Sequence, residues 1–163
     1  MRRLILGSGL LRRRDGLLLV RCRYEGEPEP LWTLPGGRQR TGELIKATVN
    51  REFREETSLE VEVEELGYVS ESVDGEAGLH VVNCTFWVTE AEIRTPVPAD
   101  PKVVAARFVP LGEALELLRA DVLRIPVAAA LGGSPHPRYF FFESESIAIP
   151  FFAHRRDRAR SDA

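Results

Sequence analysis

Short apolar runs and strict alternation of apolar and polar residues dominate the chain, and both patterns are typical of β-strands. Strands are predicted over residues 4–12 and 17–23, joined by a turn at 14–16 whose Asp-Gly pair is a hairpin signal. The same criteria predict further strands over 31–34, 59–73, 79–89, 103–109 and 138–142. Segments rich in glycine and proline separate these runs, and Pro35-Gly36-Gly37 is predicted to turn the chain.

Three segments carry helical spacing instead. Residues 42–57 predict a helix with Thr41 as its N-cap, and residues 111–118 and 122–131 predict two more. The inward face of the first helix is expected to comprise Leu44, Ala47, Thr48 and Phe53. Strands interleaved with helices predict the α/β (α+β) class, with an α/β/α sandwich around a mixed β-sheet.

Length and composition indicate an ordinary globular protein. The 163 residues are enough for one domain with a substantial core, predicted over 1–153, and the charged segment 154–163 is predicted to be a disordered tail. A net charge of −3 argues against a protein that coats a nucleic-acid polymer, but it does not exclude a nucleotide substrate.

The cysteines and the N-terminus give no sign of secretion or of a membrane. Cys22 and Cys84 lie in separate apolar runs without Cys-x-x-Cys spacing, so both are predicted to be buried, reduced thiols of a cytoplasmic protein. The charged run 12–15 interrupts the N-terminal apolar segment, which argues against a signal peptide, and the sequence has no apolar run of about 18 residues.

One helix carries a pattern that folding alone does not explain. Glu52, Glu55 and Glu56 stand at i, i+3 and i+4, so their carboxylates share one helical face and are expected to lie within a few ångströms of each other. Like charges at this spacing oppose the helix, and acids near its C-terminus oppose the helix dipole. A divalent cation would neutralise the cluster, and oxygen ligands suit Mg²⁺ or Mn²⁺.

The surrounding spacing resembles a family signature. Residues 37–59 follow G-x5-E-x7-R-E-U-x-E-E-x-G-U, in which U is a bulky apolar residue, at every fixed position except the last glycine, which is Ser58. This is similar to the signature of the Nudix hydrolases, which cleave a nucleoside diphosphate linked to another group by attack of water on phosphorus. The resemblance implies the Nudix fold. A solvated Glu/Arg-rich helix face is the alternative interpretation.

The resemblance also implies a metal site. Glu52 and Glu56 would be the principal ligands of Mg²⁺ or Mn²⁺, and Glu55 would bind directly or through water. The backbone carbonyl of Gly36 or Gly37 would complete the set. Glu52 or Glu56 would serve as the base for the attacking water, unless a residue elsewhere does so.

Three neighbouring positions would support this chemistry. Arg51 would orient the carboxylates through a salt bridge within the motif, and Glu43 would support the junction between loop and helix. Ser58 occupies a position where a left-handed residue often ends a helix, a conformation that is harder for serine than for glycine by about 1 kcal/mol. We interpret Ser58 as a change in the helix exit that leaves the carboxylates in place.

Substrate contacts are expected outside the motif. Arg21, Arg23 and Arg38 flank the motif loop and are candidates to bind phosphate, although each could be an ordinary surface arginine. Other candidates to line the pocket are Asp74, Glu76, His80 and Asn83. Asp100 is the only carboxylate near the second helix that could act from outside the motif. The aromatic segments 140–142 and 151–152 could stack a base, seal a dimer or pack in the core.

The leading hypothesis is a metal-dependent hydrolase that cleaves a phosphoanhydride bond in an NTP or dNTP, a dinucleoside polyphosphate, ADP-ribose or a nucleotide sugar. A non-catalytic nucleotide sensor on the same fold is the alternative, and an isomerase of isoprenoid diphosphates lacks a recognisable catalytic cysteine. The expected partner is a nucleotide-derived small molecule, with a possible homodimer and neither a membrane nor a nucleic-acid polymer. The sequence does not identify the group linked to the diphosphate.

Overall fold

The computed structural model describes residues 1–133 and 138–143. The predicted tail 154–163 and the aromatic pair 151–152 lie outside these residues. The strands are β1 (Arg2–Leu10), β2 (Arg12–Arg13), β3 (Gly16–Cys22), β4 (Leu31–Thr33), β5 (Gly36–Arg38), β6 (Val61–Asp74), β7 (Leu79–Glu90), β8 (Val103–Pro110) and β9 (Arg138–Glu143). The helices are α1 (Ile45–Thr57), α2 (Leu111–Leu117) and α3 (Asp121–Leu131).

The strands form two sheets. The larger has the order β5-β1-β7-β6-β9 and is mixed, because β1 pairs in parallel with β7 and β6 in parallel with β9, whereas β6 and β7 are antiparallel. The smaller is antiparallel, with the order β2-β3-β4 and with β8 on the other edge of β3. The predicted mixed α+β architecture is confirmed, and the strands are divided between two sheets.

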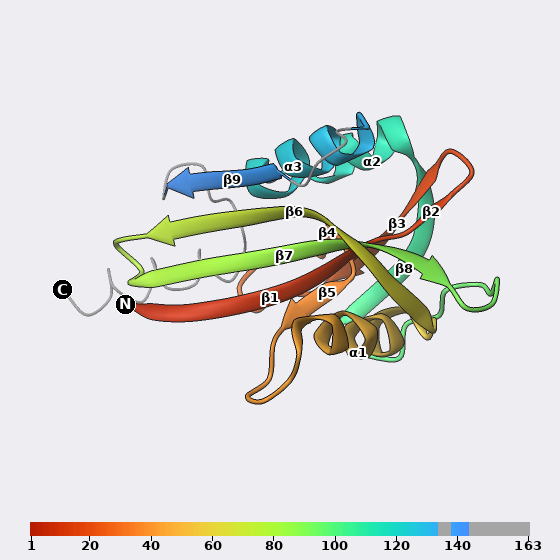
Figure 1. The fold of residues 1–163 in the computed structure, drawn as a ribbon, viewed down its shortest axis with the longest axis horizontal. Coiled ribbons are helices and arrows are strands. Elements are labelled where there is room, and N and C mark those ends of the chain that lie inside the picture. Colours follow the sequence, from red (N-terminus) through yellow and green to blue (C-terminus); the bar gives the residue numbers. More distant parts are fainter. Residues whose placement is uncertain (134–137, 144–163) are drawn as a thin grey trace.

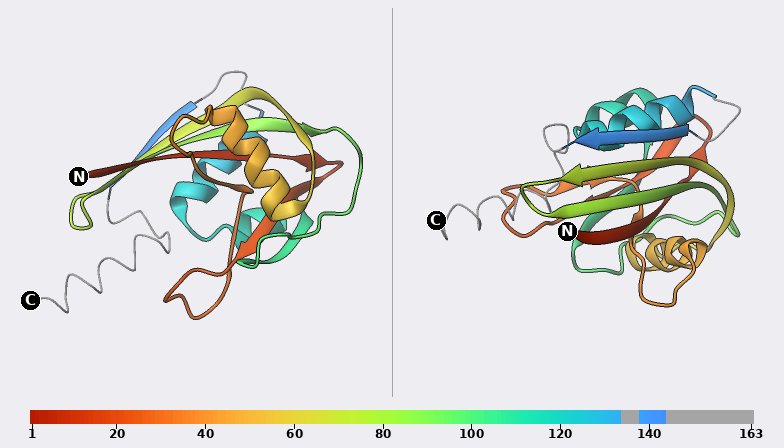
Figure 2. Two further views of the ribbon diagram at one scale, coloured as in Figure 1. Left: turned by 90° about the horizontal axis from the view of Figure 1, so that it is seen from below. Right: turned by 60° about the vertical axis from the view of Figure 1, so that its left-hand side comes forward.

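Helices cover both sides of these sheets (Figures 1 and 2). Helix α1 packs against β1, where Val49 and Phe53 are fully buried together with Leu18 of the smaller sheet. Helices α2 and α3 lie on the opposite side, where Leu118 and Val127 pack in a second core cluster. The expected layering of helix, sheet and helix is therefore present. No helix in the described part of the chain is long and apolar enough to cross a membrane.

The first helix begins later than predicted. It starts at Ile45 with Leu44 as its N-cap, so the prediction of Thr41 as the N-cap was wrong. Gly42 has φ +77°, a conformation that an α-helix excludes, and Glu43 accepts a hydrogen bond from the Arg40 backbone, which holds residues 40–43 in a loop.

The predicted inward face of this helix is confirmed for Thr48 and Phe53 and was wrong for Leu44 and Ala47. Leu44 is 77% exposed, because it lies before the first turn, and Ala47 is exposed as well. The buried side chains are Thr48, Val49, Phe53, Glu56 and Thr57. Glu56 is buried although it is charged, because this face of the helix borders the candidate site.

Gly36 and Gly37 form a short strand, although a turn was predicted for this segment. Strand β5 runs antiparallel to β1, with Gly37 opposite Gly7 and Gly36 opposite Ser8. A Cβ atom on Gly36 would lie 2.5 Å from the Gly7 carbonyl oxygen and 2.7 Å from the Ser8 Cα. Only glycine therefore allows this approach of the motif loop to the central sheet.

Ser58 ends α1 in the left-handed conformation, as predicted, with φ 57° and ψ 17°. Its backbone N–H donates to the Arg54 carbonyl at 3.0 Å, which closes the last turn. Its hydroxyl donates to the Val97 carbonyl at 2.6 Å, a contact that glycine cannot make. This hydrogen bond offsets part of the strain of a non-glycine residue here.

Candidate active site

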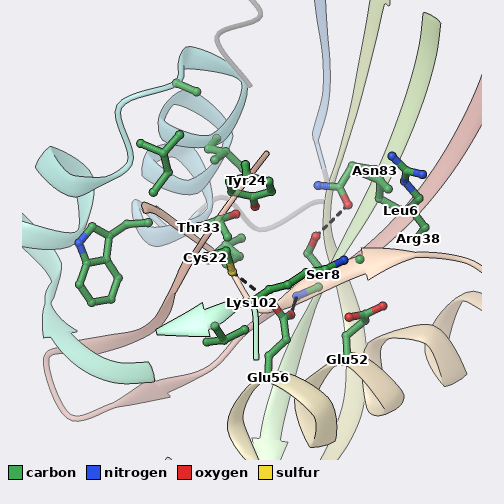
Figure 3. A pocket seen from close by; sticks show the side chains of 18 of the residues that line it. Leu6, Ser8, Cys22, Tyr24, Thr33, Arg38, Glu52, Glu56, Asn83 and Lys102 are labelled. Atoms are coloured by element: carbon green, nitrogen blue, oxygen red, sulfur yellow. Dashed lines mark hydrogen bonds between the residues drawn. The ribbon is translucent and has the colours of Figure 1, made fainter. Parts of the chain in front are cut away.

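A cleft of about 1200 Å³ opens between the two sheets, beside the last turns of α1. Its lining combines α1 and β5 with the inner face of the larger sheet, the strands β3, β4 and β8, and the segment that joins α2 to α3. Figure 3 shows Glu52 and Glu56 rising from α1 into this space, with Ser8 and Asn83 on the sheet beyond them.

Arg51 is the centre of the ionic network in the motif. Its Nε donates to Glu43 at 2.8 Å, and its Nη1 donates to Glu52 at 2.6 Å and to Glu55 at 3.3 Å. Its Nη2 donates to Glu43 at 3.1 Å and to the Arg38 carbonyl at 2.9 Å. The expected contacts between Arg51 and the motif carboxylates are thus present, and they join loop, strand and helix.

Glu43 fastens the loop to the helix. Besides Arg51, its carboxylate accepts from the Arg40 backbone N–H at 3.0 Å and from the Thr48 hydroxyl at 2.8 Å. These donors, Arg51 first among them, lower the pKa of Glu43 to about 2. The predicted role of Glu43 at the junction between loop and helix agrees with these contacts.

Glu56 is held differently from Glu52 and Glu55. It is 6% exposed, and one carboxylate oxygen accepts from the Gly36 backbone N–H at 2.7 Å while the other lies 3.6 Å from the Cys22 thiol. Burial raises the pKa of Glu56 to about 8, and repulsion from Glu52 and Asp100 adds to this rise. A buried acid with a raised pKa in a cleft is a typical feature of functional sites.

The two glycines of the motif loop make room for the carboxylates. A Cβ atom on Gly37 would lie 2.3 Å from Glu52 Oε1, so Glu52 occupies the space that any other side chain would need. The Gly9 N–H donates to the Pro35 carbonyl and the Gln39 N–H donates to the Ile5 carbonyl. These two bonds show which residue pairs of β1 and β5 are hydrogen bonded and which are not. Gly36 and Ser8 are therefore opposite each other in a pair without backbone hydrogen bonds. The N–H and the carbonyl of Gly36 point away from β1, towards α1.

The three carboxylates share one side of α1, but they do not meet at a single point. Glu52 and Glu55 turn to Arg51, whereas Glu56 turns to the Gly36 N–H. Among the residues that the structure describes, no three acidic, histidine or cysteine side chains are grouped closely enough to hold a metal ion. The predicted close convergence is therefore not observed, because Arg51 and the Gly36 N–H each bind part of the cluster.

The three predicted phosphate-binding arginines all line the cleft. The Nε of Arg21 donates to the Pro30 carbonyl at 3.2 Å, and its guanidinium lies 5.9 Å from the Trp32 ring. The side chains of Arg23 and Arg38 are exposed at the rim. Their contacts with phosphate remain predictions.

Of the remaining polar candidates, some line the cleft and others lie outside it. Asn83 and Asp100 line the cleft, and the Asp100 backbone N–H donates to the Glu55 carbonyl at 2.7 Å. Asp74 is fully buried and accepts from the Ala77 N–H in the turn between β6 and β7, and Glu76 is exposed in that turn. His80 pairs with Glu71 and is absent from the lining of the cleft.

Several residues of the cleft were not anticipated. Ser8, Ser70, Trp32, Arg107 and Cys22 all line it. The Arg107 guanidinium lies 5.0 Å from the Trp32 ring, which also contacts Arg21. Arg21, Trp32 and Arg107 come from β3, β4 and β8, so their proximity could not be predicted before the pairing of these strands was known.

The aromatic residues of β9 are split between core and surface. Phe142 is buried, and Phe140 packs edge-on against Tyr68 with ring centroids 6.2 Å apart. Phe141 is 50% exposed on the other face of the strand. The interpretation of core packing therefore holds for Phe140 and Phe142.

Comparisons with known proteins identify the family and the fold. The family model described as the NUDIX domain matches residues 3–131, more than half of the chain. A search of curated proteins finds no match. A NUDIX hydrolase from Nitrosomonas europaea is similar in fold, with 19% identity over 81% of this chain and 90% of that one and a TM-score of 0.71.

Two further structures have the same fold. A mutator MutT protein from Bacillus halodurans is 25% identical over 88% of this chain and 92% of that one, with a TM-score of 0.67. The NUDIX domain of NrtR from Shewanella oneidensis, solved in complex with ADP ribose, is 19% identical over 81% of this chain and 89% of that one, with a TM-score of 0.63. Because the NUDIX domain model matches residues 3–131, the chain is a member of the Nudix hydrolase family.

Proposed function

We propose that the protein hydrolyses a phosphoanhydride bond in a nucleoside diphosphate derivative, with Mg²⁺ or Mn²⁺ bound by the carboxylates of α1. The observation that carries this proposal is Glu56, a buried acid at the base of a large cleft whose pKa is raised to about 8. It lies beside Glu52 and Glu55, which Arg51 orients in the same cleft.

The donor set fits a hard divalent cation. Glu52 and Glu56 would supply carboxylate oxygens, and the Gly36 carbonyl points to the same side of β5 as the N–H that Glu56 accepts. Glu55 would bind directly or through water. When bound, such a cation neutralises phosphate charge and makes water a stronger nucleophile. Because the Gly36 carbonyl points towards α1, we favour Gly36 over Gly37 as the backbone ligand.

The side chains of this protein would contribute position and charge. Arg51 binds Glu52 and Glu55, and Glu43 in turn binds Arg51, so Arg51 would restrain both acids while a bound cation draws Glu52 towards Glu56. Arg21, Arg23 and Arg38 would bind phosphate oxygens from the wall and rim of the cleft. Such contacts stabilise the charge that develops on phosphate during cleavage.

A substrate panel with chromatographic separation of products tests the proposal. The panel should contain NTPs and dNTPs, a dinucleoside polyphosphate, a nucleotide sugar and ADP-ribose, the last because the NrtR domain binds it. We expect release of phosphate, pyrophosphate or a nucleoside monophosphate that requires Mg²⁺ or Mn²⁺ and stops with EDTA. Tight binding without turnover across the panel would instead support a non-catalytic sensor.

A further inference from the structure

The wall of the cleft formed by the larger sheet is polar where a sheet usually presents apolar residues to the interior. Ser8 of β1, Asn83 of β7 and Ser70 and Ser72 of β6 are 7%, 8%, 3% and 2% exposed, and all four line the cleft. Burying a hydroxyl or amide costs free energy unless it finds a hydrogen-bond partner. We call these four residues the polar wall.

The strand register places the polar wall on one face of the sheet. Ser70 is the direct partner of Asn83 across β6 and β7, and Ser72 is two residues further along the same face. Leu6 is the partner of Asn83 across β1 and β7, so Ser8 stands on the same face, one pleat along. The four side chains therefore form a patch that spans three adjacent strands.

Asn83 is oriented by Ser8. The Ser8 hydroxyl donates to the Asn83 amide oxygen at 2.9 Å, and Figure 3 shows the amide nitrogen directed into the open part of the cleft. In the described part of the chain, Ser70 and Ser72 form no side-chain hydrogen bond, so their hydroxyls are available to a ligand in the cleft. The wall thus presents one fixed N–H₂ donor and two adaptable hydroxyls.

Apolar side chains surround the polar wall. Leu6, Leu79 and Val81 line the cleft beside it, and Leu123 of α3 lines it as well. Apolar surface together with a few fixed hydrogen-bonding groups suits a flat heteroaromatic ring with a polar edge. It does not suit a phosphate, because the four residues of the wall are neutral.

We propose that Asn83, positioned by Ser8, determines substrate specificity by donating a hydrogen bond from its amide to an acceptor on the nucleobase. This inference rests on the proposed function and adds which part of the substrate meets this wall. A ring carbonyl offers two lone pairs, whereas a ring nitrogen offers one. Bases with an exocyclic carbonyl, such as guanine, hypoxanthine and uracil, should therefore depend on Asn83 more than adenine does.

The test compares Asn83→Leu, Ser8→Ala and the control Cys84→Ala, which changes the next residue of β7 on the opposite face of the sheet. For each variant, KM and kcat are measured over nucleotides with different bases, in ribose and deoxyribose forms. Calorimetry measures binding of the corresponding nucleoside monophosphates, so recognition of the base is measured independently of turnover. Thermal denaturation verifies that each variant is folded.

For Asn83→Leu we expect KM and Kd to rise about tenfold for guanine, hypoxanthine and uracil nucleotides, with less change for adenine and with kcat nearly constant. Ser8→Ala should give the same pattern at about a third of the size, because the amide remains but loses its anchor. Cys84→Ala should match wild type.

Two results would overturn the inference while leaving the proposed function intact: an equal change for every base, or a loss that follows the ribose 2′-hydroxyl. If Asn83→Leu does not fold, Ser70→Ala provides the same comparison, with an equal change for every base again counting against the inference. Failure of the proposed function would appear separately, as absent turnover in a wild-type protein whose binding of monophosphates still depends on Asn83.

Discussion

Glu52, Glu55 and Glu56 project from one helix of 13 residues, whereas the polar wall opposite them is assembled from three strands. Helical geometry sets the spacing of the first group. Arg51, at most four residues away, binds Glu52 and Glu55, and Glu56 accepts from the Gly36 N–H of the preceding loop. The second depends on contacts such as Ser8 with Asn83, which are 75 residues apart. The two sides of one cleft therefore differ in how directly the sequence encodes them.

The difference suggests a division of labour. A motif set mainly by one helix and its preceding loop depends on few distant contacts, which suits the charged groups that we propose act on the diphosphate. A wall built from distant strands can change one residue at a time without disturbing the motif, which suits recognition of the part of the substrate that varies. Variants on each side should therefore fail in different ways.

The largest effect is expected on the helix side. Glu52→Gln and Glu56→Gln should each lower turnover on the order of a thousandfold, because each removes a negative ligand from the proposed cation site without changing side-chain shape. Steady-state kinetics at saturating Mg²⁺ measures this loss, and circular dichroism verifies the fold. Glu60→Gln is the control, since Glu60 is exposed and forms an ion pair with Arg54. Turnover near that of the control in both variants would refute the assignment.

The two glycines of β5 should separate activity from stability. Gly37→Ala places its Cβ against the flexible end of Glu52, so we expect about 10- to 100-fold slower turnover and a nearly unchanged melting temperature. Gly36→Ala places its Cβ against the backbone of Gly7 and Ser8, so we expect a loss of about 1–3 kcal/mol in stability.

Gly75→Ala is the matched control for both glycine variants, because nothing lies within 4 Å of its added Cβ. Kinetics and thermal denaturation are measured on all three proteins. The same loss of stability in Gly37→Ala and Gly36→Ala would contradict the distinction between a side-chain clash and a backbone clash.

Glu43 should contribute a pH-dependent part of the stability. Its folded-state pKa of about 2 lies below its ordinary value near 4.5, so it stabilises the fold above the ordinary value, and this stabilisation is lost as the pH falls through about 2. Glu43→Gln should therefore melt below wild type at pH 6, and the difference should shrink between about pH 4.5 and pH 2. A difference that is constant over this range would show that the ionised carboxylate is not the cause.

The smallest effect is expected where the chain departs from the family signature. Ser58→Gly relieves about 1 kcal/mol of left-handed strain, but it removes the hydrogen bond to Val97, which is worth about as much. Stability should thus change by less than about 1 kcal/mol, and turnover should stay constant. A large change in turnover would mean that this position acts on the carboxylates.

Local features were predictable from the sequence alone. The spacing of Arg51 and the glutamates, the left-handed exit at Ser58 and most strand positions follow from short-range rules, and the structure agrees with them. The start of the helix did not follow, because the conformation of Gly42 and the bond from Arg40 to Glu43 decide it. The N-cap is Leu44, which makes no side-chain capping hydrogen bond, so a search for a polar capping residue could not find it.

Long-range features could not be predicted by the same rules. Asn83 was one of several polar candidates. Alternation along β7 separates it from His80, but only the packing of the two sheets shows that the face of Asn83 lines the cleft and that His80 pairs with Glu71 outside it. The proximity of Cys22 to Glu56 also depends on how the smaller sheet packs against α1. In each case the deciding contact joins residues from elements distant in sequence.

Binding of Mn²⁺, followed by electron paramagnetic resonance in the absence of substrate, tests the central claim most directly. Wild type and Glu60→Gln should bind the ion alike, whereas the double variant Glu52→Gln, Glu56→Gln should bind it at least about tenfold more weakly. Equal Mn²⁺ affinity in all three proteins would contradict the claim that the acids of α1 hold the catalytic cation.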